Sequence, residues 1–303
     1  MPTPKRHALL LINPESRLGL EQDLSAGIDI LREHGCTVDE ATLGKEGRDE
    51  IIPSGADKYD LLIIGGGDGT LSKMAAAVLA SGLPLGVLPL GTGNNLARTL
   101  NIPFGIEEAC RVIAEGNLKK VDLGRVNGSL FFNVASLGLS TEVIEELDQE
   151  TKKRWGSLAY FHAFFRVMRR DIIENQVFTA EIITDEKKFQ MESIQISVGN
   201  GRYYGGGMVV AEDSEIDDHE LVLYTIKPQS FFELMRMAPS FITGRHAEFD
   251  RVIVLHGRKF EIHTDRPMTI DVDGELTQQT PGYFDILPDA MEIFVPAANA
   301  AKE

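Results

Sequence analysis

A glycine-rich segment that contains one acid is the residue pattern best suited to chemistry. Gly65-Gly66-Gly67-Asp68-Gly69-Thr70 follows the apolar run Asp60–Ile64 and precedes a helical pattern over Leu71–Ala80. Glycines let the backbone approach a ligand closely, and the N–H groups at a helix start favour a phosphate. Asp68 would repel a phosphate unless a Mg²⁺ or a substrate hydroxyl proton lies between them. The segment therefore predicts a catalytic phosphate site, whereas the alternative is an ordinary tight turn of an α/β protein.

A second loop has a similar character. Pro89-Leu90-Gly91-Thr92-Gly93-Asn94-Asn95-Leu96-Ala97 follows the next apolar strand pattern, Leu85–Pro89. Both loops are expected to leave the carboxyl edge of one parallel sheet, where open α/β folds bind ligands. Thr92, Asn94 and Asn95 offer neutral groups for a phosphate or a ribose; the alternative for the two asparagines is helix capping.

Three acids alternate near the end of the chain, at Asp271, Asp273 and Glu275. In a strand, alternate residues share a face, so the three carboxylates are expected to converge. A nearby cation or a raised pKa would relieve their repulsion, and such a carboxylate suits proton removal from a substrate hydroxyl. The alternative is an Asp-Gly hairpin turn whose acids are solvated.

A separate acidic segment, residues 212–220, holds six carboxylates in nine residues. Oxygen-rich clusters of this kind suit Mg²⁺ or Ca²⁺. A solvated acidic loop is the alternative interpretation.

The elements that must position these groups fall into two parts. Up to about residue 125, strand patterns at His7–Ile12 and Thr37–Leu43 alternate with helical patterns such as Glu21–Glu33, which predicts a mostly parallel sheet covered on both faces. The remainder predicts an antiparallel sandwich or barrel, interrupted by helices near Ser157–Arg170 and Gln229–Thr243. Its strand patterns are Phe178–Thr184, Phe189–Val198, Glu220–Ile226, Arg251–Leu255, Arg258–His263, Met268–Val272 and Met291–Val295.

Composition limits the function classes. The 303-residue chain has a formal net charge of −16, which disfavours a nucleic-acid binder. No apolar run approaches the roughly 20 residues of a membrane-spanning helix, and Ala8–Ile12 is too short for a signal peptide. We therefore expect a cytoplasmic protein. Cys36 and Cys110 form no metal or disulfide pattern and are predicted to be buried free thiols.

One segment is basic, although the chain as a whole is acidic. Thr151–Arg170 carries six basic residues and no acid, with aromatic residues between them. It predicts either peripheral contact with an anionic membrane face through Lys152, Lys153 and Arg154, or a core helix with charged ends. The second helix, near Gln229–Thr243, is predicted to be core or the wall of a lipid cleft. An exposed edge strand could also pair two copies into a homodimer.

Taken in order along the chain, these motifs resemble the diacylglycerol kinase catalytic family, specifically the bacterial soluble lipid kinases. The resemblance implies an α/β nucleotide-binding domain over residues 1–125, similar to those of phosphofructokinases and NAD kinases. It implies a β-sandwich lipid domain over residues 126–287, with residues 288–303 returning to the first domain. The motifs that carry it are Asn13-Pro14, Gly66–Thr70, Pro89–Asn94, Val198-Gly199-Asn200-Gly201-Arg202-Tyr203-Tyr204-Gly205-Gly206-Gly207, the acidic segment to Leu221, and Asp271–Glu275.

The resemblance also implies a reaction and a set of roles. The family transfers the γ-phosphate of ATP to a lipid hydroxyl, such as that of diacylglycerol, in phospholipid metabolism. Glu275 would accept the proton, with Asp273 beside it, and Asp68 would act through Mg²⁺ and water near the phosphates. The residues implied in ATP contact are Asn13, Thr42, Gly66, Gly67, Asp68, Gly69, Thr70, Leu71, Ser72, Thr92 and Asn94.

A structural Mg²⁺ site is implied in the acidic segment. Asp218 would bind the ion through its side chain, and Glu215 and Glu220 through their backbone carbonyls. Two residues depart from the family pattern, because Arg17 and His219 stand where glycines are usual. If the position of His219 requires a left-handed backbone, the histidine would be strained there.

Two other functions remain open. A NAD kinase or another small-molecule kinase can share the Gly-Gly-Asp-Gly-Thr sequence, but the Pro89–Asn94 loop favours the lipid kinases. A non-catalytic lipid- or nucleotide-binding relative is the second alternative, and the presence of both Asp68 and Glu275 favours an enzyme.

Overall fold

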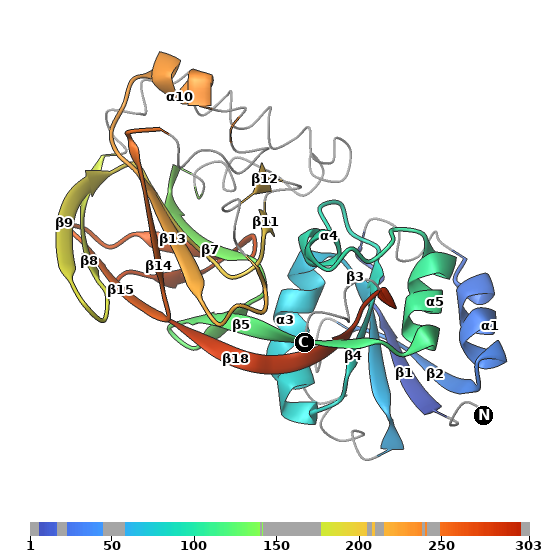
Figure 1. Ribbon diagram of the computed structural model, residues 1–303. Coiled ribbons are helices and arrows are strands. Elements are labelled where there is room, and N and C mark those ends of the chain that lie inside the picture. The colour runs from blue at the N-terminus through green and yellow to red at the C-terminus, as the bar shows by residue number, and fades with distance from the viewer. Residues whose placement is uncertain are drawn as a thin grey trace. The chain divides into compact units, whose positions relative to one another are not determined.

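The computed structural model describes residues 6–16, 23–44, 58–139, 141, 177–204, 208–209, 215–237, 240 and 249–297 (Figure 1). The chain divides into two compact units, unit 1 (Met1–Val121 with Asp289–Glu303) and unit 2 (Asp122–Pro288). Arg17 and the basic segment with Lys152, Lys153 and Arg154 lie outside the described residues.

Unit 1 is built on a parallel sheet. The segments Ala8–Leu11 and Leu61–Ile64 are buried at every position, as expected of strands that are covered on both faces. Ile12 is opposite Thr42 on one side and Gly65 on the other, and Gly66 is opposite Pro89, so the strands end together. In order across the sheet, the strands are β2 (Cys36–Thr42), β1 (Arg6–Ile12), β3 (Leu61–Gly66) and β4 (Leu85–Pro89).

Helices cover both faces of this sheet. In Figure 1, α1 (Ser25–Glu33) and α5 (Ile106–Glu115) lie on one face and α3 (Asp68–Ser81) on the other. α1 packs closely on α5, since a Cβ at Gly27 would lie 2.8 Å from the Sγ of Cys110. Cys36 and Cys110 are buried and free, which confirms that prediction.

The last strand, β18 (Gly282–Phe294), contributes to both units. Ile293 lies opposite Leu85 of β4 in a parallel register, and Ile293, Phe294 and Val295 are buried. The N–H of Val295 donates to the carbonyl of Asn117 at 3.0 Å. The strand pattern Met291–Val295 is therefore the end of a longer strand, and it supplies core residues to unit 1.

Unit 2 contains two sheets. One has six antiparallel strands in the order β14-β13-β10-β7-β16-β17; the other contains β18, β15, β8 and β9, with β5 beside β18 and β6 beside β5. The bounds are β5 (Leu118–Val126), β6 (Ser129–Phe131), β7 (Val134–Gly138), β8 (Phe178–Ile183), β9 (Lys188–Ser193), β10 (Gln195–Gly199), β13 (Leu221–Ile226), β14 (Val252–Gly257), β15 (Lys259–Thr264), β16 (Thr269–Val272) and β17 (Glu275–Gln279). A short hairpin, β11 (Tyr203–Tyr204) and β12 (Met208–Val209), and the helix α10 (Phe231–Met237) complete the described elements.

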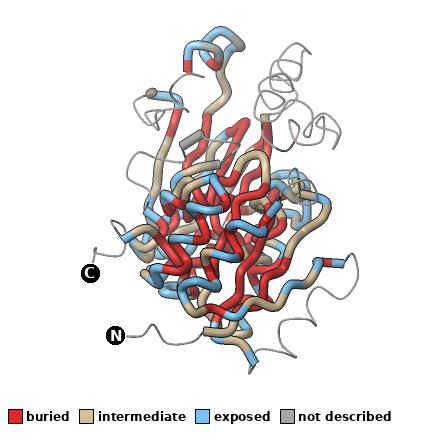
Figure 2. The backbone as a smooth tube through the Cα atoms, turned by 90° about the vertical axis from the view of Figure 1, so that its right-hand side faces the viewer, coloured by how far each residue is buried: buried red, intermediate tan, exposed pale blue. Residues whose placement is uncertain are grey.

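The core of unit 2 lies between its sheets. One cluster of buried apolar side chains joins Ile196 of β10 and Leu223 of β13 to Phe260 of β15 and Phe284 of β18. Figure 2 shows the buried positions gathered in the inner part of the fold and the exposed ones around it. The predicted β-sandwich is confirmed.

Two sequence expectations are corrected in unit 2. The predicted strand Phe189–Val198 is two strands, β9 and β10, which separate at Ile194 and join different sheets. The apolar helix near residue 231 is only partly core, because Leu234 and Met237 are buried while Phe232 is 81% exposed.

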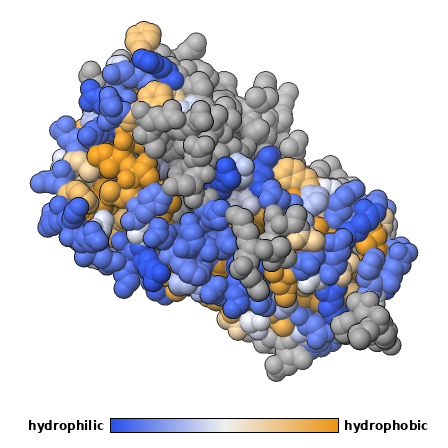
Figure 3. Space-filling view, viewed as in Figure 1, coloured by the Kyte–Doolittle hydropathy of each residue, from blue (hydrophilic) through white to orange (hydrophobic). Residues whose placement is uncertain are grey.

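Hydrophilic side chains cover much of the described part of the face shown in Figure 3, in keeping with the charge of −16. Among the described residues, none of the helices has the length and apolar character that crossing a bilayer requires.

Candidate active site

The predicted nucleotide-binding residues of unit 1 lie at one edge of its sheet. The strand ends carry Thr42 at the end of β2, Asn13 directly after β1, Gly66 at the end of β3 and Pro89 at the end of β4. Thr42 is exposed there, and the N–H of Leu43 donates to the carbonyl of Ile12 at 2.8 Å. The structure therefore brings together residues that are far apart in the sequence.

The two glycine-rich loops pack backbone against backbone. A Cβ on Gly91 would lie 2.4 Å from the Cα of Gly67, and a Cβ on Gly67 would lie 2.9 Å from the Cα of Gly91. The N–H of Leu90 donates to the carbonyl of Gly66 at 3.0 Å. No other residue type fits at this contact without displacing the backbone, so glycine leaves peptide groups accessible where side chains would otherwise stand. This bare surface fits the phosphate chain of a nucleotide.

The helix after the first loop begins earlier than predicted. α3 starts at Asp68 rather than Leu71, with Gly67 as the residue before it and no side chain capping its first N–H groups. Its 14 residues direct the positive end of the helix dipole at the sheet edge. Gly69, Thr70, Leu71 and Ser72 are consequently helical residues, and because Leu71 is buried, only its main chain could reach a ligand.

Asn13 braces the first loop. Its Nδ2 donates to the Oγ1 of Thr70 at 2.7 Å, and its backbone N–H donates to the carbonyl of Gly65 at 2.9 Å. The methyl and hydroxyl groups of Thr70 also fill the space where a Cβ on Gly66 would stand. Asn13 and Thr70 thus fix the conformation of the loop.

Asn94 braces the second loop in a similar way. Its backbone is left-handed, with φ 49°, and its Oδ1 accepts the N–H of Gly91 at 2.9 Å. Its Nδ2 donates to the carbonyls of Gly91 and Pro89, at 3.1 and 3.3 Å. The carboxamide is thereby used within the loop, while Thr92 is only partly buried at its tip. Asn94 precedes α4 (Asn95–Thr99) but makes no side-chain capping bond to it.

Asp68 connects the two loops. Its Oδ1 accepts the N–H of Leu96 at 3.2 Å, so the acid of the first loop holds the start of α4 after the second. Burial of the carboxyl raises its pKa above the ordinary value, and backbone N–H groups, that of Leu96 foremost, oppose this shift. An acid is therefore kept in a place where its ionised form is disfavoured.

This burial predicts a pH-dependent effect of Asp68→Asn on stability. Between the ordinary and the raised pKa, the folded state binds more protons at this site than the unfolded state, so the wild type loses stability as pH rises. Asparagine can still accept the Leu96 N–H but carries no charge. We expect Asp68→Asn to unfold at or above the wild-type temperature at pH 8, with the difference vanishing towards pH 4.

Thermal unfolding from pH 4 to 8 measures this effect, with the exposed Asp29→Asn as the matched control. A variant that is less stable than wild type at pH 8 would show that the hydrogen bonds of the ionised carboxylate outweigh its burial.

The three acids near the end of the chain do not share one strand, which corrects that expectation. Asp273 and Gly274 have φ of 50° and 93°, and they form the two-residue turn between β16 and β17. Positive φ at both positions is the type I′ turn, for which Asp-Gly is a preferred pair. Asp271 is buried on β16, whereas Glu275 is partly buried at the start of β17, opposite Val272.

Asp273 anchors a neighbouring turn. Its carboxylate accepts three backbone N–H groups, from Phe132 at 2.8 Å and from Asn133 and Val134 at 3.0 Å each. The N–H of Asp273 in turn donates to the carbonyl of Val134 at 2.9 Å. These bonds fix the hairpin that carries Glu275 against the segment between β6 and β7, so Asp273 orients the proposed base.

The acidic segment forms a compact loop. Asp218 accepts the N–H of Glu220 on one carboxylate oxygen, at 3.0 Å, and that of Glu215 on the other, at 3.3 Å. Desolvation within this loop raises the pKa of Asp218 above its ordinary value, and the nearby Asp122 adds to the shift. A cation would relieve this crowding of carboxylates, so the donor chemistry fits Mg²⁺.

His219 has the left-handed backbone that a glycine would adopt most easily, with φ 62°. Its backbone N–H and its ring Nδ1 both bond the carboxylate of Asp122, at 2.7 and 3.0 Å. Asp122 is fully buried, and its own N–H donates to the carbonyl of Ile216 at 2.8 Å. The bond from the ring Nδ1 to Asp122, which a glycine could not make, accounts for a histidine at a strained position.

Sequence reasoning missed Asp122 and Asn133 of unit 2 and gave Asn200 no role of its own. Asp122, Asn133 and Asn200 are each at most 3% exposed, and Asn200 donates from its Nδ2 to the carbonyls of Asp122 and Phe132, at 3.0 Å each. Asn200 and Gly201 lie within a motif already noted, but Asp122 and Asn133 stand singly among apolar residues and give no pattern.

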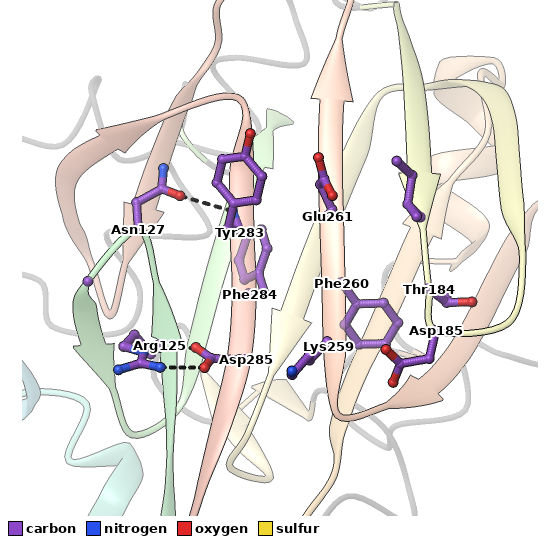
Figure 4. A pocket seen from close by; sticks show the side chains of 12 residues that line it. Arg125, Asn127, Thr184, Asp185, Lys259, Phe260, Glu261, Tyr283, Phe284 and Asp285 are labelled. Carbon is purple, nitrogen blue, oxygen red and sulfur yellow. Dashed lines mark hydrogen bonds and ion pairs between the residues drawn. The ribbon is translucent and has the colours of Figure 1, made fainter.

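A pocket of about 450 Å³ opens elsewhere in unit 2 (Figure 4). Arg125 and Asp285 form an ion pair in it, with Nε and Oδ1 2.9 Å apart, and Lys259, Glu261 and Tyr283 also line it. None of the predicted site residues lies in its wall, and its acids and bases nearly balance, so it is not the candidate active site.

Two family matches cover most of the chain. Residues 7–126 match the diacylglycerol kinase catalytic domain, and residues 133–295 match the YegS C-terminal NAD kinase beta sandwich-like domain. The chain belongs to this diacylglycerol kinase and YegS family of lipid kinase-like proteins, as the motifs predicted.

Individual relatives agree with the family. The chain is 32% identical over 96% of both chains to the "Probable lipid kinase YegS-like" of Xanthomonas euvesicatoria. It is 30% identical to the "Diacylglycerol kinase" of Staphylococcus epidermidis, over 79% of this chain and 75% of the relative. An uncharacterized Synechocystis protein is 31% identical, and the match spans 55% of that longer protein.

Solved structures share the fold. The crystal structure of a diacylglycerol kinase from Bacillus anthracis superposes with a TM-score of 0.74 at 20% identity, over 97% of this chain and 98% of the other. A second structure from that organism reaches a TM-score of 0.82 at 24% identity, over 97% and 96% of the two chains.

Proposed function

We propose that the protein is an ATP- and Mg²⁺-dependent lipid kinase that phosphorylates the hydroxyl of diacylglycerol or a related lipid. The observation that carries this proposal is the contact between the two glycine-rich loops, Gly65–Thr70 and Gly91–Asn94, at the carboxyl edge of the sheet. The family to which the chain belongs supports a lipid acceptor.

Unit 1 is the proposed nucleotide-binding half. The bare peptide groups of the loops and the start of α3 suit the phosphates of ATP, and Asn13 and Thr70 hold the first loop in shape. Thr42, Ser72 and Thr92 stand at the same edge with hydroxyl groups for further hydrogen bonds. Asp68 would bind Mg²⁺ or water next to the phosphates.

Unit 2 supplies the proposed base. The carboxylate of Glu275 takes the proton of the lipid hydroxyl as the hydroxyl oxygen forms its bond to the γ-phosphorus. The bond between the γ-phosphorus and its bridging oxygen breaks, and ADP leaves. Asp273 holds the hairpin that carries Glu275 and makes no contact with the reacting atoms in this assignment.

A second Mg²⁺ has a structural role in the proposal. The side chain of Asp218 and the backbone carbonyls of Glu215 and Glu220 would hold it. When bound, the ion would neutralise the carboxylates of the loop.

The proposed function is tested by offering the protein ATP, Mg²⁺ and a total lipid extract, and by detecting phosphorylated products with mass spectrometry. Diacylglycerol alone is the second arm, and NAD is the third, because the C-terminal family description names a NAD kinase-like sandwich. We expect a phosphorylated lipid and no NADP. ATP consumption with NAD alone would replace the proposal with a NAD kinase, and no product in any arm would support a non-catalytic binding protein.

A lipid acceptor requires access to a membrane, so we propose a cytoplasmic protein with peripheral contact through Lys152, Lys153 and Arg154. Each basic residue near an anionic surface contributes about 1 kcal/mol to binding. We also propose a homodimer, for which β14 is a candidate because it ends the six-stranded sheet in the described part of the chain.

Replacing Lys152, Lys153 and Arg154 with glutamine should lower the affinity for phosphatidylglycerol-containing vesicles tenfold or more, as measured by sedimentation. The expected size follows from the loss of three basic contacts of about 1 kcal/mol each. The control replaces Lys187, Lys188 and Lys259, which are exposed in unit 2, and makes the same charge change. Equal vesicle binding by both triple variants would support the alternative of a core helix.

A further inference from the structure

Asn133 is a buried polar residue whose side-chain oxygen has no hydrogen-bond partner among the described residues. The residue is 3% exposed, and its Oδ1 accepts no bond from the described part of the chain. Leaving such a group unsatisfied costs about 1–3 kcal/mol, so stability alone would favour an apolar side chain of the same size. A buried unpaired acceptor in a native protein requires another explanation.

The main chain of Asn133, by contrast, is fixed on both sides. Its N–H donates to the carboxylate of Asp273 at 3.0 Å, and its carbonyl accepts the N–H groups of Asn200 at 2.8 Å and Gly201 at 3.1 Å. The residue is therefore held in place while its side-chain oxygen is left unused, which is how a recognition group is positioned.

Gly201 lies directly beside this oxygen. A Cβ at Gly201 would lie 3.3 Å from the Oδ1 of Asn133 and 3.0 Å from the carbonyl oxygen of Phe132. Any larger residue would press on both acceptors.

Asn200 contributes a second unpaired acceptor. Its Nδ2 donates to two carbonyls, and this fixes the orientation of its carboxamide. Its Oδ1 is buried in a residue that is 1% exposed and has no partner among the described residues. Two neighbouring carboxamides thus each present an oxygen that needs a donor.

The segment that carries Asn133 is hydrogen-bonded to the hairpin that carries Glu275, the proposed base. Asp273 accepts the N–H of Asn133 and forms the turn that leads directly into Glu275. Asp273 therefore positions both residues. It bonds the main chain of Asn133, and it precedes Glu275 in the chain with only Gly274 between them.

We infer that Asn133 binds a second hydrogen-bond donor of the acceptor lipid, beside the hydroxyl that Glu275 deprotonates. The inference rests on the proposed function and narrows the substrate class to lipids whose head carries two donors, such as two hydroxyl groups. Diacylglycerol, with one hydroxyl, would leave the oxygen of Asn133 unsatisfied. A site built to bond a substrate hydroxyl discriminates strongly against an analogue that lacks it.

The test compares monoacylglycerol, which has two hydroxyls, with diacylglycerol, which has one, in the wild type and in Asn133→Leu. We expect the ratio of kcat/KM for monoacylglycerol to that for diacylglycerol to fall at least tenfold in Asn133→Leu. The loss should lie in the KM for monoacylglycerol, with the KM for ATP unchanged. The unfolding temperature should equal or exceed that of the wild type, because the variant no longer buries an unpaired oxygen. Asn133→Ala should show the same change of ratio if leucine does not fit.

Asn200→Leu is the structural comparison, because it removes two hydrogen bonds to carbonyls and should lower the unfolding temperature. An unchanged ratio in both Asn133 variants, together with a lower unfolding temperature, would mean that Asn133 bonds only a buried water and would overturn the inference. Failure of the wild type to phosphorylate any component of a total lipid extract, while it consumes ATP with an acceptor that is not a lipid, would overturn the proposed function as well.

Discussion

Replacing Glu275 with glutamine should reduce lipid phosphorylation by about 10²–10⁴-fold, the range over which a general base contributes. Glutamine has nearly the same shape but cannot take the proton from the lipid hydroxyl. Glu275 lies at the start of β17, directly after a turn held by Asp273, so the substitution leaves the fold intact. We expect unchanged binding of ATP and an unchanged unfolding temperature.

Initial rates at saturating ATP and lipid measure this effect. Thr277→Ala is the matched control, because residue 277 is exposed on the same strand two positions further on. Wild-type turnover by Glu275→Gln would exclude Glu275 as the base. Asp273→Ala should instead lower the unfolding temperature, because three backbone N–H groups would lose their acceptor.

Replacing Gly91 with alanine should separate the two glycine-rich loops. The new Cβ would lie 2.4 Å from the Cα of Gly67 and 2.8 Å from the Oδ1 of Asn94, and backbone on the far side cannot move as a flexible side chain would. Overpacking of this kind costs about 1–3 kcal/mol. Since the contact also shapes the proposed phosphate-binding surface, we expect the KM for ATP to rise at least tenfold, a change worth about 1.4 kcal/mol.

The control is Gly82→Ala, at the end of α3. Gly82 has a positive φ, of 65°, but no atom lies within 4 Å of the place that a Cβ would take there, so alanine strains the backbone without a collision. It should lower the unfolding temperature and leave the KM for ATP unchanged. Equal ATP kinetics in the Gly91 and Gly82 variants would show that the loop contact does not shape the nucleotide site.

The arrangement of the candidate nucleotide-binding residues could be predicted from local patterns. Buried parallel strands appear as short apolar runs, and Leu61–Gly66 and Leu85–Pro89 are each followed by glycines. Because parallel strands end at a common edge, the sequence order alone brings Asn13 and the two loops together. The start of α3 was the less predictable part, since Asp68 and Gly69 are weak helix formers that the helix accommodates in its first turn.

The acids of unit 2 show where such patterns are insufficient. Asp271, Asp273 and Glu275 alternate as they would in one strand, but Asp273 and Gly274 both accept positive φ and form a turn. The choice depends on what lies beside the hairpin, and the three N–H groups between β6 and β7 are some 140 residues away in sequence. The role of Asn133 could not be predicted from the sequence for the same reason. It is a single asparagine between Phe132 and Val134, and the residues that hold it in place, Asp273, Asn200 and Gly201, are distant in sequence.

β18 has a consequence for the order in which the protein matures on the ribosome. β4 lies between β3 and the end of β18, and the buried Ile293, Phe294 and Val295 are translated after the whole of unit 2. At about 5–20 residues per second, roughly 10–35 s separate the emergence of Val121 from that of Val295. The half of the protein that is encoded first is thus the last to be completed, and nascent unit 1 must keep one side of β4 uncovered while unit 2 is being made.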